Sequence, residues 1–553
     1  MINYSEILSR IRETTLQKLP EYHILILRNI TLEPYFENYL QYHILRLGYR
    51  AQIHYGNYDM IAQDATDKLL FNRVDCVLVF QYLETESPMF SRYFLRCKQS
   101  EIESETGRIL SKMQKTITDI RKQTDAPILW SGFELPIYPS DSFNKTNYSQ
   151  MRIINDLNRQ LQELSQPMMD VHILDLDACI RRVGAEQFYH LRGWYAFRAP
   201  YGKCGCDAIA WEVSRHVCDF IGHRKKCLVL DCDNVLWGGI IGEDGINGIQ
   251  LGDSGVGAAY QDFQAEILNL CQQGVILALC SKNNACDVWE VFHNHPGMVL
   301  KPDHIAAYKI NWDNKVNNIC ALAEELHLGL DSMVFADDSE FEIEMVRKYL
   351  PKITTMLMPV ERPHCYRTLL ASCGYFDVHT LTREDRERVK MYKAQSKREQ
   401  LYASCANMDE YLASLKIQVI YHPLDAFHLS RVAQLTQRTN QFNMNPIRYT
   451  PQELDNLVHQ PDYDSFCVEI SDRFGNFGTV GACLLRYEQR RAIIEQFLLS
   501  CRALGRDVEK QMLSHCMKLI RNRGYDHVAA HYVQTERNGM VKEFMQKSNI
   551  ESI

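Results

Sequence analysis

Short apolar runs alternate with longer segments of helical periodicity over the first 220 residues or so of the chain. Such runs predict strands that are buried on both faces of a parallel sheet. The predicted strands are residues 23–27, 52–55, 74–80, 127–130 and 171–174. The predicted helices between them lie near residues 33–47, 90–122, 148–164 and 207–221. This alternation predicts an α/β domain with a parallel, flavodoxin-like sheet.

A second group of apolar runs ends in residues that can carry chemistry. The runs are 228–230, which precedes Asp231 and Asp233; 274–280, which ends at Ser281; and 332–336, which precedes Asp337 and Asp338. An apolar-periodic helix begins near Lys315. Open α/β sheets place their ligands at the carboxyl ends of their strands. The sequence therefore predicts a Rossmann-like domain in which these polar side chains share one edge.

The two aspartates after the first of these runs predict a cation site. Asp231 and Asp233 are two residues apart, so an extended chain puts both side chains on the same side. Two carboxylates so close repel each other unless a cation or a shared proton lies between them. Mg²⁺ suits such a pair, because it takes a few carboxylates and leaves room for a phosphate. A solvated strand end is the alternative interpretation.

In chain order, these segments resemble the four motifs of the haloacid dehalogenase superfamily of phosphohydrolases. The resemblance implies that Asp231 is the nucleophile and Asp233 the general acid/base of a phosphoryl transfer. It implies phosphate binding by Ser281, Lys282, Asn283 and Lys315, and Mg²⁺ binding by Asp231, Asp233, Asp337 and Asp338.

The last part of the chain predicts a separate α/β domain. Its strands are expected at residues 418–421, 467–471, 479–486, 492–499 and 526–532, and its helices at 426–436 and 508–522. This order resembles the GCN5-related N-acetyltransferase (GNAT) fold, in which a glycine loop binds the pyrophosphate of coenzyme A. The loop at 502–507 resembles it at Arg502, Gly505 and Arg506, which are the candidate pantetheine-binding residues. Asp507 departs from the pattern, and a plain strand-turn-helix junction is the alternative.

The N-terminal domain resembles the SGNH hydrolases without their active-site residues. The segment 27–31 stands where that family has its nucleophilic serine, and no Asp-x-x-His is evident near 193–216. A non-catalytic scaffold is therefore expected, with retained hydrolase chemistry as the alternative. The expected domains are 1–222 (SGNH-like), 223–372 (haloacid dehalogenase-like) and 416–553 (GNAT-like), joined by a charged helical connector at 373–415.

Five segments together resemble the FkbH-like family, which is subfamily IIIC of the haloacid dehalogenase superfamily. They are residues 230–239, 280–284, 311–315, 438–443 and 500–506. The resemblance implies a glyceryltransferase/phosphatase that loads a glyceryl group from 1,3-bisphosphoglycerate, a phosphorylated three-carbon substrate, onto an acyl carrier protein in polyketide-type biosynthesis. Such a relay needs a thiol, for which Cys280 is the candidate; a buried strand cysteine is the alternative. A small-metabolite phosphatase and a GNAT-type acyltransferase remain open as alternative functions.

Composition narrows the class of protein. The 553 residues carry a formal charge of −8, which argues against a nucleic-acid partner and against an anionic membrane surface. No apolar run approaches the length of a membrane-spanning helix, and no basic-then-apolar leader is evident. The nineteen cysteines are scattered through apolar runs, as is common in a reducing compartment. We therefore expect a cytoplasmic protein.

Overall fold

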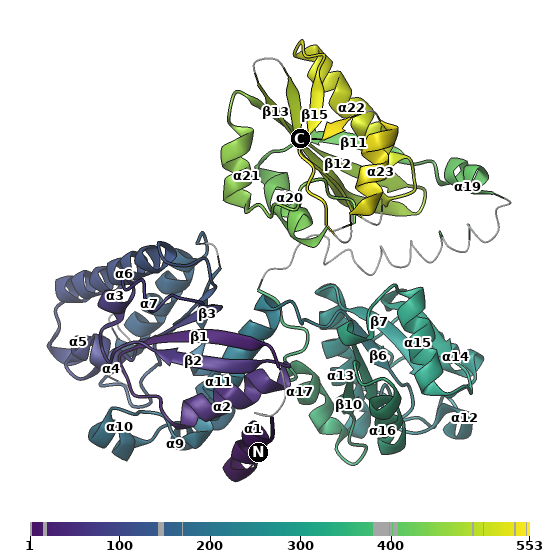
Figure 1. The fold of residues 1–553 in the computed structure, drawn as a ribbon. Helices are drawn as coiled ribbons and strands as arrows, with labels where there is room; N and C mark the ends of the chain where they lie inside the picture. The colour runs from purple at the N-terminus through teal and green to yellow at the C-terminus, as the bar shows by residue number, and fades with distance from the viewer. Residues whose placement is uncertain are drawn as a thin grey trace. The chain divides into compact units, whose positions relative to one another are not determined.

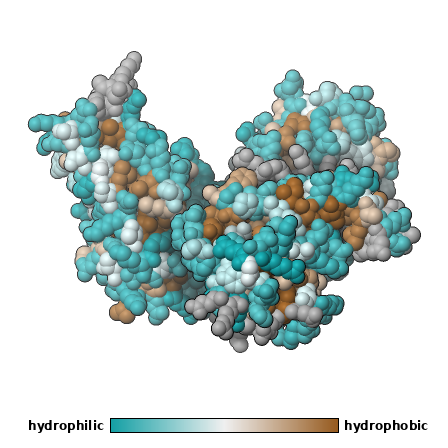
Figure 2. Space-filling view, turned by 90° about the horizontal axis from the view of Figure 1, so that it is seen from above, coloured by the Kyte–Doolittle hydropathy of each residue, from teal (hydrophilic) through white to brown (hydrophobic). Residues whose placement is uncertain are grey.

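The computed structural model describes residues 3–14, 19–141, 149–168, 170–379, 398, 401, 407–439, 441–488, 491–500, 503–535, 538–548 and 550–552 (Figure 1). It is of the mixed α/β class and divides into two compact units. The first comprises Met1–Arg224 with Cys373–Thr380, and the second comprises Lys225–Ser372 with Leu381–Ile553. No helix in the described ranges is long and apolar enough to cross a bilayer. The surface drawn in Figure 2 is mostly hydrophilic, with separate hydrophobic patches.

The first unit contains a five-stranded parallel sheet of order β2-β1-β3-β4-β5, as the alternation of strands and helices predicts. Its strands are β1 (Glu21–Arg28), β2 (Arg50–Tyr55), β3 (Cys76–Phe80), β4 (Ile128–Ser131) and β5 (Val171–Leu174). Its helices are α1 (Tyr4–Thr14), α2 (Tyr35–Arg46), α3 (Ile61–Asp64), α4 (Leu83–Glu86), α5 (Pro88–Ser91), α6 (Gln99–Arg121), α7 (Gln150–Ser165), α8 (Leu176–Val183), α9 (Ala185–Phe188), α10 (Leu191–Phe197) and α11 (Lys203–Phe220).

Two apolar cores cover the two faces of this sheet. Ile24 and Ile26 of β1 belong to one core, whereas Leu25 and Leu27 belong to the other. Successive side chains of a strand point to opposite faces, so a strand buried on both sides reads as an unbroken apolar run. This is why the strands were predictable from the sequence.

The single helix predicted at 90–122 is wrong. The chain instead forms α5, a short 3₁₀ turn at Phe94–Arg96, and α6. Ser87 caps α5 by accepting a hydrogen bond from the Phe90 N–H. The Lys98 N–H donates to the Glu101 side chain at 2.7 Å, and this bond starts α6 anew. The two caps stop a pattern that periodicity alone reads as continuous.

The segment after the central domain returns to the first unit. It packs against α11, where Arg215 forms an ion pair with Asp377. His379 Nδ1 lies 2.6 Å from an Asp219 oxygen, and its Nε2 lies 2.7 Å from His216 Nδ1. The first residues of the predicted connector therefore belong to the N-terminal fold. Most of residues 380–406 lies outside the described part of the chain, and α19 (Met408–Leu415) follows.

We expect the docking of this segment to weaken in acid. Burial lowers the pKa of His172 to about 4 and the pKa of His216 to about 3. The His172 ring centroid lies 3.9 Å from that of His379. Asp219, Arg215 and Arg121 are the other charged groups that act on the two histidines. Both histidines stay neutral in the folded protein, whereas in the unfolded chain they take up protons below about pH 6.5. Their contribution to the free energy of unfolding is therefore fully present above pH 6.5 and is lost as the pH falls toward 4. Thermal unfolding of this unit should occur roughly 2–8 °C lower at pH 5 than at pH 7. In His172→Phe the melting temperature should depend less steeply on pH. An unchanged slope would contradict the assignment of the acid sensitivity to the buried histidines.

The central domain has a second parallel sheet of order β10-β9-β6-β7-β8. Its strands are β6 (Cys227–Leu230), β7 (Ile276–Ser281), β8 (Ile305–Ile310), β9 (Met333–Asp337) and β10 (Thr354–Leu357). Its helices are α12 (Ile241–Asp244), α13 (Gly255–Gln272), α14 (Ala285–Asn294), α15 (Lys315–Glu325), α16 (Glu340–Tyr349) and α17 (Tyr366–Ala371). Apolar side chains of α15 and α16 cover one face of the sheet. β8 and β10, which were not predicted, flank the sheet and are less buried, so their apolar pattern is weaker.

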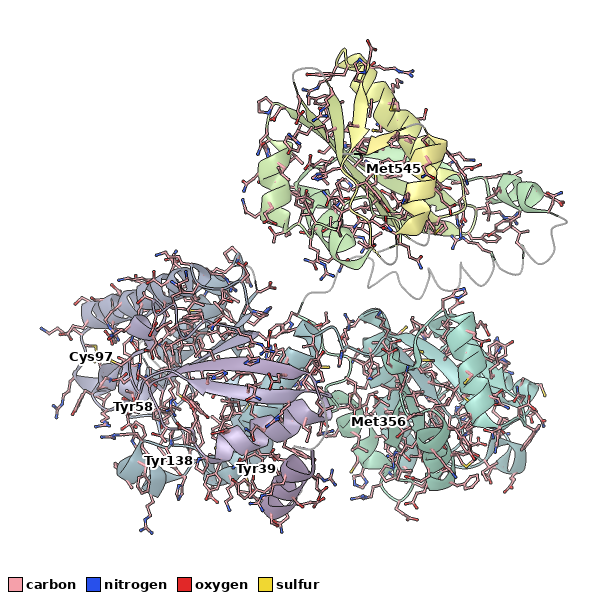
Figure 3. All side chains as sticks on the ribbon, in the orientation of Figure 1. Tyr39, Tyr58, Cys97, Tyr138, Met356 and Met545 are labelled. Carbon is pink, nitrogen blue, oxygen red and sulfur yellow. The ribbon has the colours of Figure 1, made fainter. Side chains whose placement is uncertain are left out.

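The C-terminal domain is a six-stranded mixed sheet of order β11-β12-β13-β14-β15-β16. Its strands are β11 (Gln418–Pro423), β12 (Tyr463–Asp472), β13 (Gly475–Tyr487), β14 (Ala492–Leu499), β15 (Val528–Ala530) and β16 (Glu551–Ser552). α22 (Val508–Asn522) and α23 (Gly539–Lys547) supply one core, in which Met545 is buried (Figure 3). α20 (Ala426–Arg438) and α21 (Pro451–Val458) supply the core on the other side. Neighbouring strands are antiparallel from β11 to β14, whereas β15 runs parallel to β14.

Candidate active site

The site lies where three adjacent strands of the central domain end. β6 lies between β9 and β7, so its following residue, Asp231, sits between Asp337 at the end of β9 and Ser281 at the end of β7. The Asp231 N–H donates to the Ala336 carbonyl at 3.0 Å, which continues the pairing of β6 and β9 past the last residue of β6. The parallel topology thus brings the residues of three separate motifs to one edge.

Three carboxylates gather at this edge. One oxygen each from Asp231, Asp337 and Asp338 lies within 4.8 Å of the other two. Asp337 is held by the Ser339 N–H, which donates to its Oδ1 at 2.9 Å. Ser339 also caps α16, so the start of that helix fixes the turn that carries Asp337 and Asp338.

One buried cation accompanies the three carboxylates. Lys315 Nζ lies 3.0 Å from Asp231 Oδ2 and 2.5 Å from Asp337 Oδ2. Lys315 is the first residue of α15, which Asn314 caps by accepting from the Val316 N–H. Burial acts to lower the pKa of Lys315, but the two carboxylates raise it, so the lysine stays charged. One positive charge among three carboxylates leaves the cluster negative.

The donor set fits a divalent cation such as Mg²⁺. Asp231 Oδ1 is buried and accepts no hydrogen bond from any described residue. Burial, together with the charge of Asp231, raises the pKa of Asp337 and of Asp338. For Asp337, burial and the charge of Asp231 raise the pKa by more than the ion pair with Lys315 lowers it. The reason is that a carboxylate loses its hydration in this negatively charged cluster. A hard cation with oxygen ligands relieves both the excess charge and the unpaired oxygen.

The side chain of Asp233 does not join this cluster, which corrects its prediction as a carboxylate ligand of the metal. Its Oδ1 accepts from Trp237 Nε1 at 2.9 Å and from the Ile241 N–H at 3.1 Å. Its Oδ2 accepts from Asn283 Nδ2 at 3.0 Å, and the same amide lies 3.1 Å from Ser281 Oγ. Burial raises the pKa of Asp233, which favours a carboxyl group that holds a proton. The position suits the predicted acid/base role.

Two residues outside the predicted catalytic set shape the site. Trp237 is fully buried and holds Asp233 in place, although its pattern equally fits an ordinary core tryptophan. Asn234 has a left-handed backbone with φ of 55°; its Oδ1 accepts from the Gly239 N–H, and its carbonyl accepts from the Tyr366 hydroxyl. Asparagine tolerates that conformation better than most residues, so its place directly after Asp233 was a usable signal.

A solved bacterial structure is similar over most of the chain. The N-terminal part of the protein BF1531 from Bacteroides fragilis, which contains a phosphatase domain and is complexed with Mg, has a TM-score of 0.60 and 25% identity; the match covers 69% of this chain and all of that chain. The lipase Lip_vut3 from a goat rumen metagenome matches 35% of this chain (95% of its own) at 11% identity and a TM-score of 0.28. The ribosomal-protein-S18-alanine N-acetyltransferase of Escherichia coli matches 24% of this chain and 76% of its own chain, at 9% identity and a TM-score of 0.19. No family model and no curated protein matches the sequence.

The structure does not support Cys280 as a nucleophile. Its side chain is completely buried in the core beneath α15 and α16, and its thiol contacts the Lys315 carbonyl at 4.0 Å. Burial raises the pKa of the Cys280 thiol to about 12, despite the nearby charge of Lys315. A nucleophilic cysteine needs the opposite environment, one that is partly exposed and favours the thiolate. Strand alternation keeps Cys280 in the core and aims Ser281 toward the site.

Cys280→Ser is therefore expected to leave the chemistry intact. Serine is close in volume to cysteine, but its hydroxyl is more polar, so we expect a loss of about 1–2 kcal/mol of stability. The rate of phosphate release should stay within a factor of about three of wild type. Loss of any acyl adduct in this variant, measured by intact mass, would reinstate Cys280 as a relay.

Lys282 is not free to bind a phosphate in this structure. Its Nζ forms an ion pair with Glu342 on α16 at 2.7 Å, and the Glu342 side chain is largely buried. Ser281, Asn283 and Lys315 lie at the site, whereas the ammonium group of Lys282 is drawn toward α16. Of the four side chains predicted to bind phosphate, Lys282 is the one that pairs with a carboxylate outside the site instead.

The predicted pantetheine loop is only partly described, and Arg502 lies outside the described residues. Gly505 is exposed and has φ of 72°, as a turn requires. Arg506 does not face solvent, which corrects its predicted role: its guanidinium lies 4.8 Å from the Phe477 ring centroid and 3.8 Å from Asp472. Arg398 lies over the same ring at 4.0 Å and binds Asp472 with two hydrogen bonds. Arg506 thus belongs to a buried structural cluster.

The edge of β14 next to that loop is covered by the chain itself. The Met444 N–H donates to the Phe497 carbonyl at 3.1 Å, and the Leu499 N–H donates to the Phe442 carbonyl at 2.9 Å. The Val533 N–H donates to the Met444 carbonyl at 3.0 Å. Residues 442–444 therefore bridge β14 and the segment after β15 like an added strand. A ligand that pairs with this edge must first displace them.

Proposed function

We propose that the protein is a Mg²⁺-dependent phosphoryl hydrolase whose reaction centre is the strand-end cluster of the central domain. The observation that carries this proposal is the group of Asp231, Asp337 and Asp338 together with the buried ammonium of Lys315, which pairs with Asp231 and Asp337. Three carboxylates with one lysine on the carboxyl edge of a parallel sheet suit a metal ion and a phosphate. The similarity to a solved Mg-bound structure that contains a phosphatase domain supports the proposal.

The residues can divide the reaction between them. The Asp231 carboxylate attacks phosphorus, and the bond from phosphorus to the leaving oxygen breaks as Asp233 gives that oxygen its proton. Asp233 then takes a proton from the water that opens the aspartyl phosphate, which releases phosphate and restores Asp231. Lys315 neutralises charge on Asp231 and the phosphoryl oxygens. Mg²⁺, which Asp231, Asp337 and Asp338 would hold, would supply further neutralisation of that charge.

The finer proposal is an FkbH-like glyceryltransferase/phosphatase. In this reaction a glyceryl group passes from 1,3-bisphosphoglycerate to the phosphopantetheine thiol of an acyl carrier protein, and the remaining phosphate is removed. The five ordered segments that resemble the family support it. Because Cys280 is buried in the core, transfer is expected to go directly to the carrier thiol without an enzyme adduct there. The same burial favours a small-metabolite phosphatase as the second candidate.

One experiment separates the two candidates. The protein is mixed with Mg²⁺, 1,3-bisphosphoglycerate and a holo acyl carrier protein; intact-mass spectra of both proteins are then recorded while free phosphate is assayed. A glyceryl mass on the carrier together with released phosphate supports the transferase. Phosphate release with an unmodified carrier supports the small-metabolite phosphatase. No phosphate release from this or from generic phosphomonoesters, with or without Mg²⁺, would overturn the hydrolase proposal itself.

A further inference from the structure

The C-terminal domain has a polar array at the point where two of its central strands part. β14 and β15 pair in parallel up to Ile494 and Ala530, and the next residues are Glu495 and His531. Glu495 is also the extra residue of a β-bulge, because Leu484 pairs with Gln496 whereas Leu485 pairs with Ile494. Bulges re-aim side chains and are enriched beside active sites.

Three side chains form a hydrogen-bonded line at this point. Arg486 Nε donates to Glu495 Oε2 at 3.0 Å, and Glu495 Oε1 lies 3.4 Å from His531 Nδ1. The Glu495 side chain is 14% exposed, whereas that of His531 is 41% exposed. The carboxylate is therefore enclosed while the imidazole can meet a ligand.

The surroundings distinguish this array from a solvated surface ion pair. The Asn445 side chain donates to the Glu495 carbonyl at 3.2 Å, and Gln496 Nε2 donates to the Asn445 carbonyl at 2.7 Å, so Asn445 holds the bulge with two hydrogen bonds. Burial and the charge of Glu495 raise the pKa of Tyr449 to about 12, and they also raise that of Tyr463. The charge of Glu495 therefore acts on two nearby tyrosines.

We propose that His531 is the general base of an acyl-transfer site in the C-terminal domain, with Glu495 as its positioning residue and a thiol as the acceptor. A carboxylate that accepts from Nδ1–H fixes the imidazole tautomer and leaves Nε2 to take a proton. Arg486 orients Glu495 through the hydrogen bond from its Nε. This inference rests on the proposed transferase function for its acyl donor, an acyl phosphate.

The step balances without a further reactant. His531 Nε2 takes the proton of the thiol as sulfur attacks the acyl carbon, and a carbon–sulfur bond forms. The bond from that carbon to the phosphate oxygen breaks, phosphate leaves with the electron pair, and the imidazolium returns its proton to water. Removal of the second phosphate of the product is then the separate task of the Asp231 site.

The test compares His531→Ala with wild type, using pantetheine as the thiol and 1,3-bisphosphoglycerate as the donor. Glyceryl-pantetheine is measured by mass spectrometry, and phosphate release from p-nitrophenyl phosphate reports the central domain. General-base catalysis contributes about 100- to 10,000-fold, so thioester formation should fall at least 100-fold in the variant. Phosphate release from p-nitrophenyl phosphate should be unchanged. His527→Ala removes an exposed histidine just before β15 and should match wild type in both assays.

Two further readouts separate a base from a structural residue. Added imidazole should restore at least a tenth of the lost rate to His531→Ala, and Glu495→Gln should lose at least tenfold because it no longer fixes the tautomer. Thioester formation within tenfold of wild type in His531→Ala, or a loss that imidazole does not restore, would overturn the inference and leave the proposed function standing. If wild type releases phosphate but makes no thioester, the transferase function fails, and the acceptor site fails with it.

Discussion

Asp231→Asn is expected to abolish phosphate release while the protein stays folded. The amide has the shape of the carboxylate but is a poor nucleophile, and loss of a positioned nucleophile costs on the order of a thousandfold to a millionfold in rate. Asp231 also supplies the buried Oδ1 that accepts no hydrogen bond from any described residue, so the change alters the oxygen most available to phosphorus or a cation. Release of inorganic phosphate from p-nitrophenyl phosphate at saturating Mg²⁺ measures the effect.

Asp262→Asn is the matched control. Asp262 is exposed on α13 of the same domain, so the same chemical change there should leave the rate within twofold of wild type. Circular dichroism and the melting temperature establish that both variants are folded. A rate for Asp231→Asn within tenfold of wild type would remove Asp231 from the nucleophile's role, whatever the control shows.

Lys315→Met is expected to lower both stability and activity. The change leaves Asp231, Asp337 and Asp338 together without the ammonium group that pairs with two of them, and removing one partner of a buried ion pair costs about 3–5 kcal/mol. The melting temperature of the central domain should fall by on the order of 10 °C in the absence of divalent metal. Phosphate release should fall at least 100-fold. Added Mg²⁺ should raise the melting temperature of the variant more than that of wild type, since the cluster is more negative.

Lys309→Met serves as the control for charge loss alone. Lys309 forms a half-exposed ion pair with Glu325 in the same domain, and such pairs contribute only about 0–1 kcal/mol. Its melting temperature should therefore change by no more than about 4 °C. If Mg²⁺ shifts the melting temperature of neither Lys315→Met nor wild type, the carboxylate cluster does not bind the metal.

Many of the strands and helices could be predicted from the pattern of apolar residues in short stretches of the sequence. The inner strands of the two parallel sheets are unbroken apolar runs because both of their faces are covered, and that pattern is visible in a short window of the sequence. The helix predicted at 90–122 failed because Ser87 and Glu101, through backbone caps, restart the helix within an otherwise periodic stretch. The mostly half-buried edge strands β8 and β10 lacked the signal altogether.

The cluster at the strand ends was predictable for a topological reason. Parallel strands all end at one edge, so knowing that Asp231, Ser281 and Asp337 each follow or end a strand is enough to bring them together. Lys315 joins them because it begins the helix that follows β8. The site needed only local patterns and one rule about parallel sheets.

Partner choice was decided by the tertiary structure, because partners come from distant parts of the chain. Lys282 is drawn to Glu342, and Arg506 turns inward to Phe477 and Asp472. Glu495 and His531 meet only because β14 pairs with β15. The sequence by itself determined which residue types stand at the strand ends and therefore the chemistry open to the site. Burial and remote charges, which set the direction of each side chain and its proton affinity, exist only once the chain has folded.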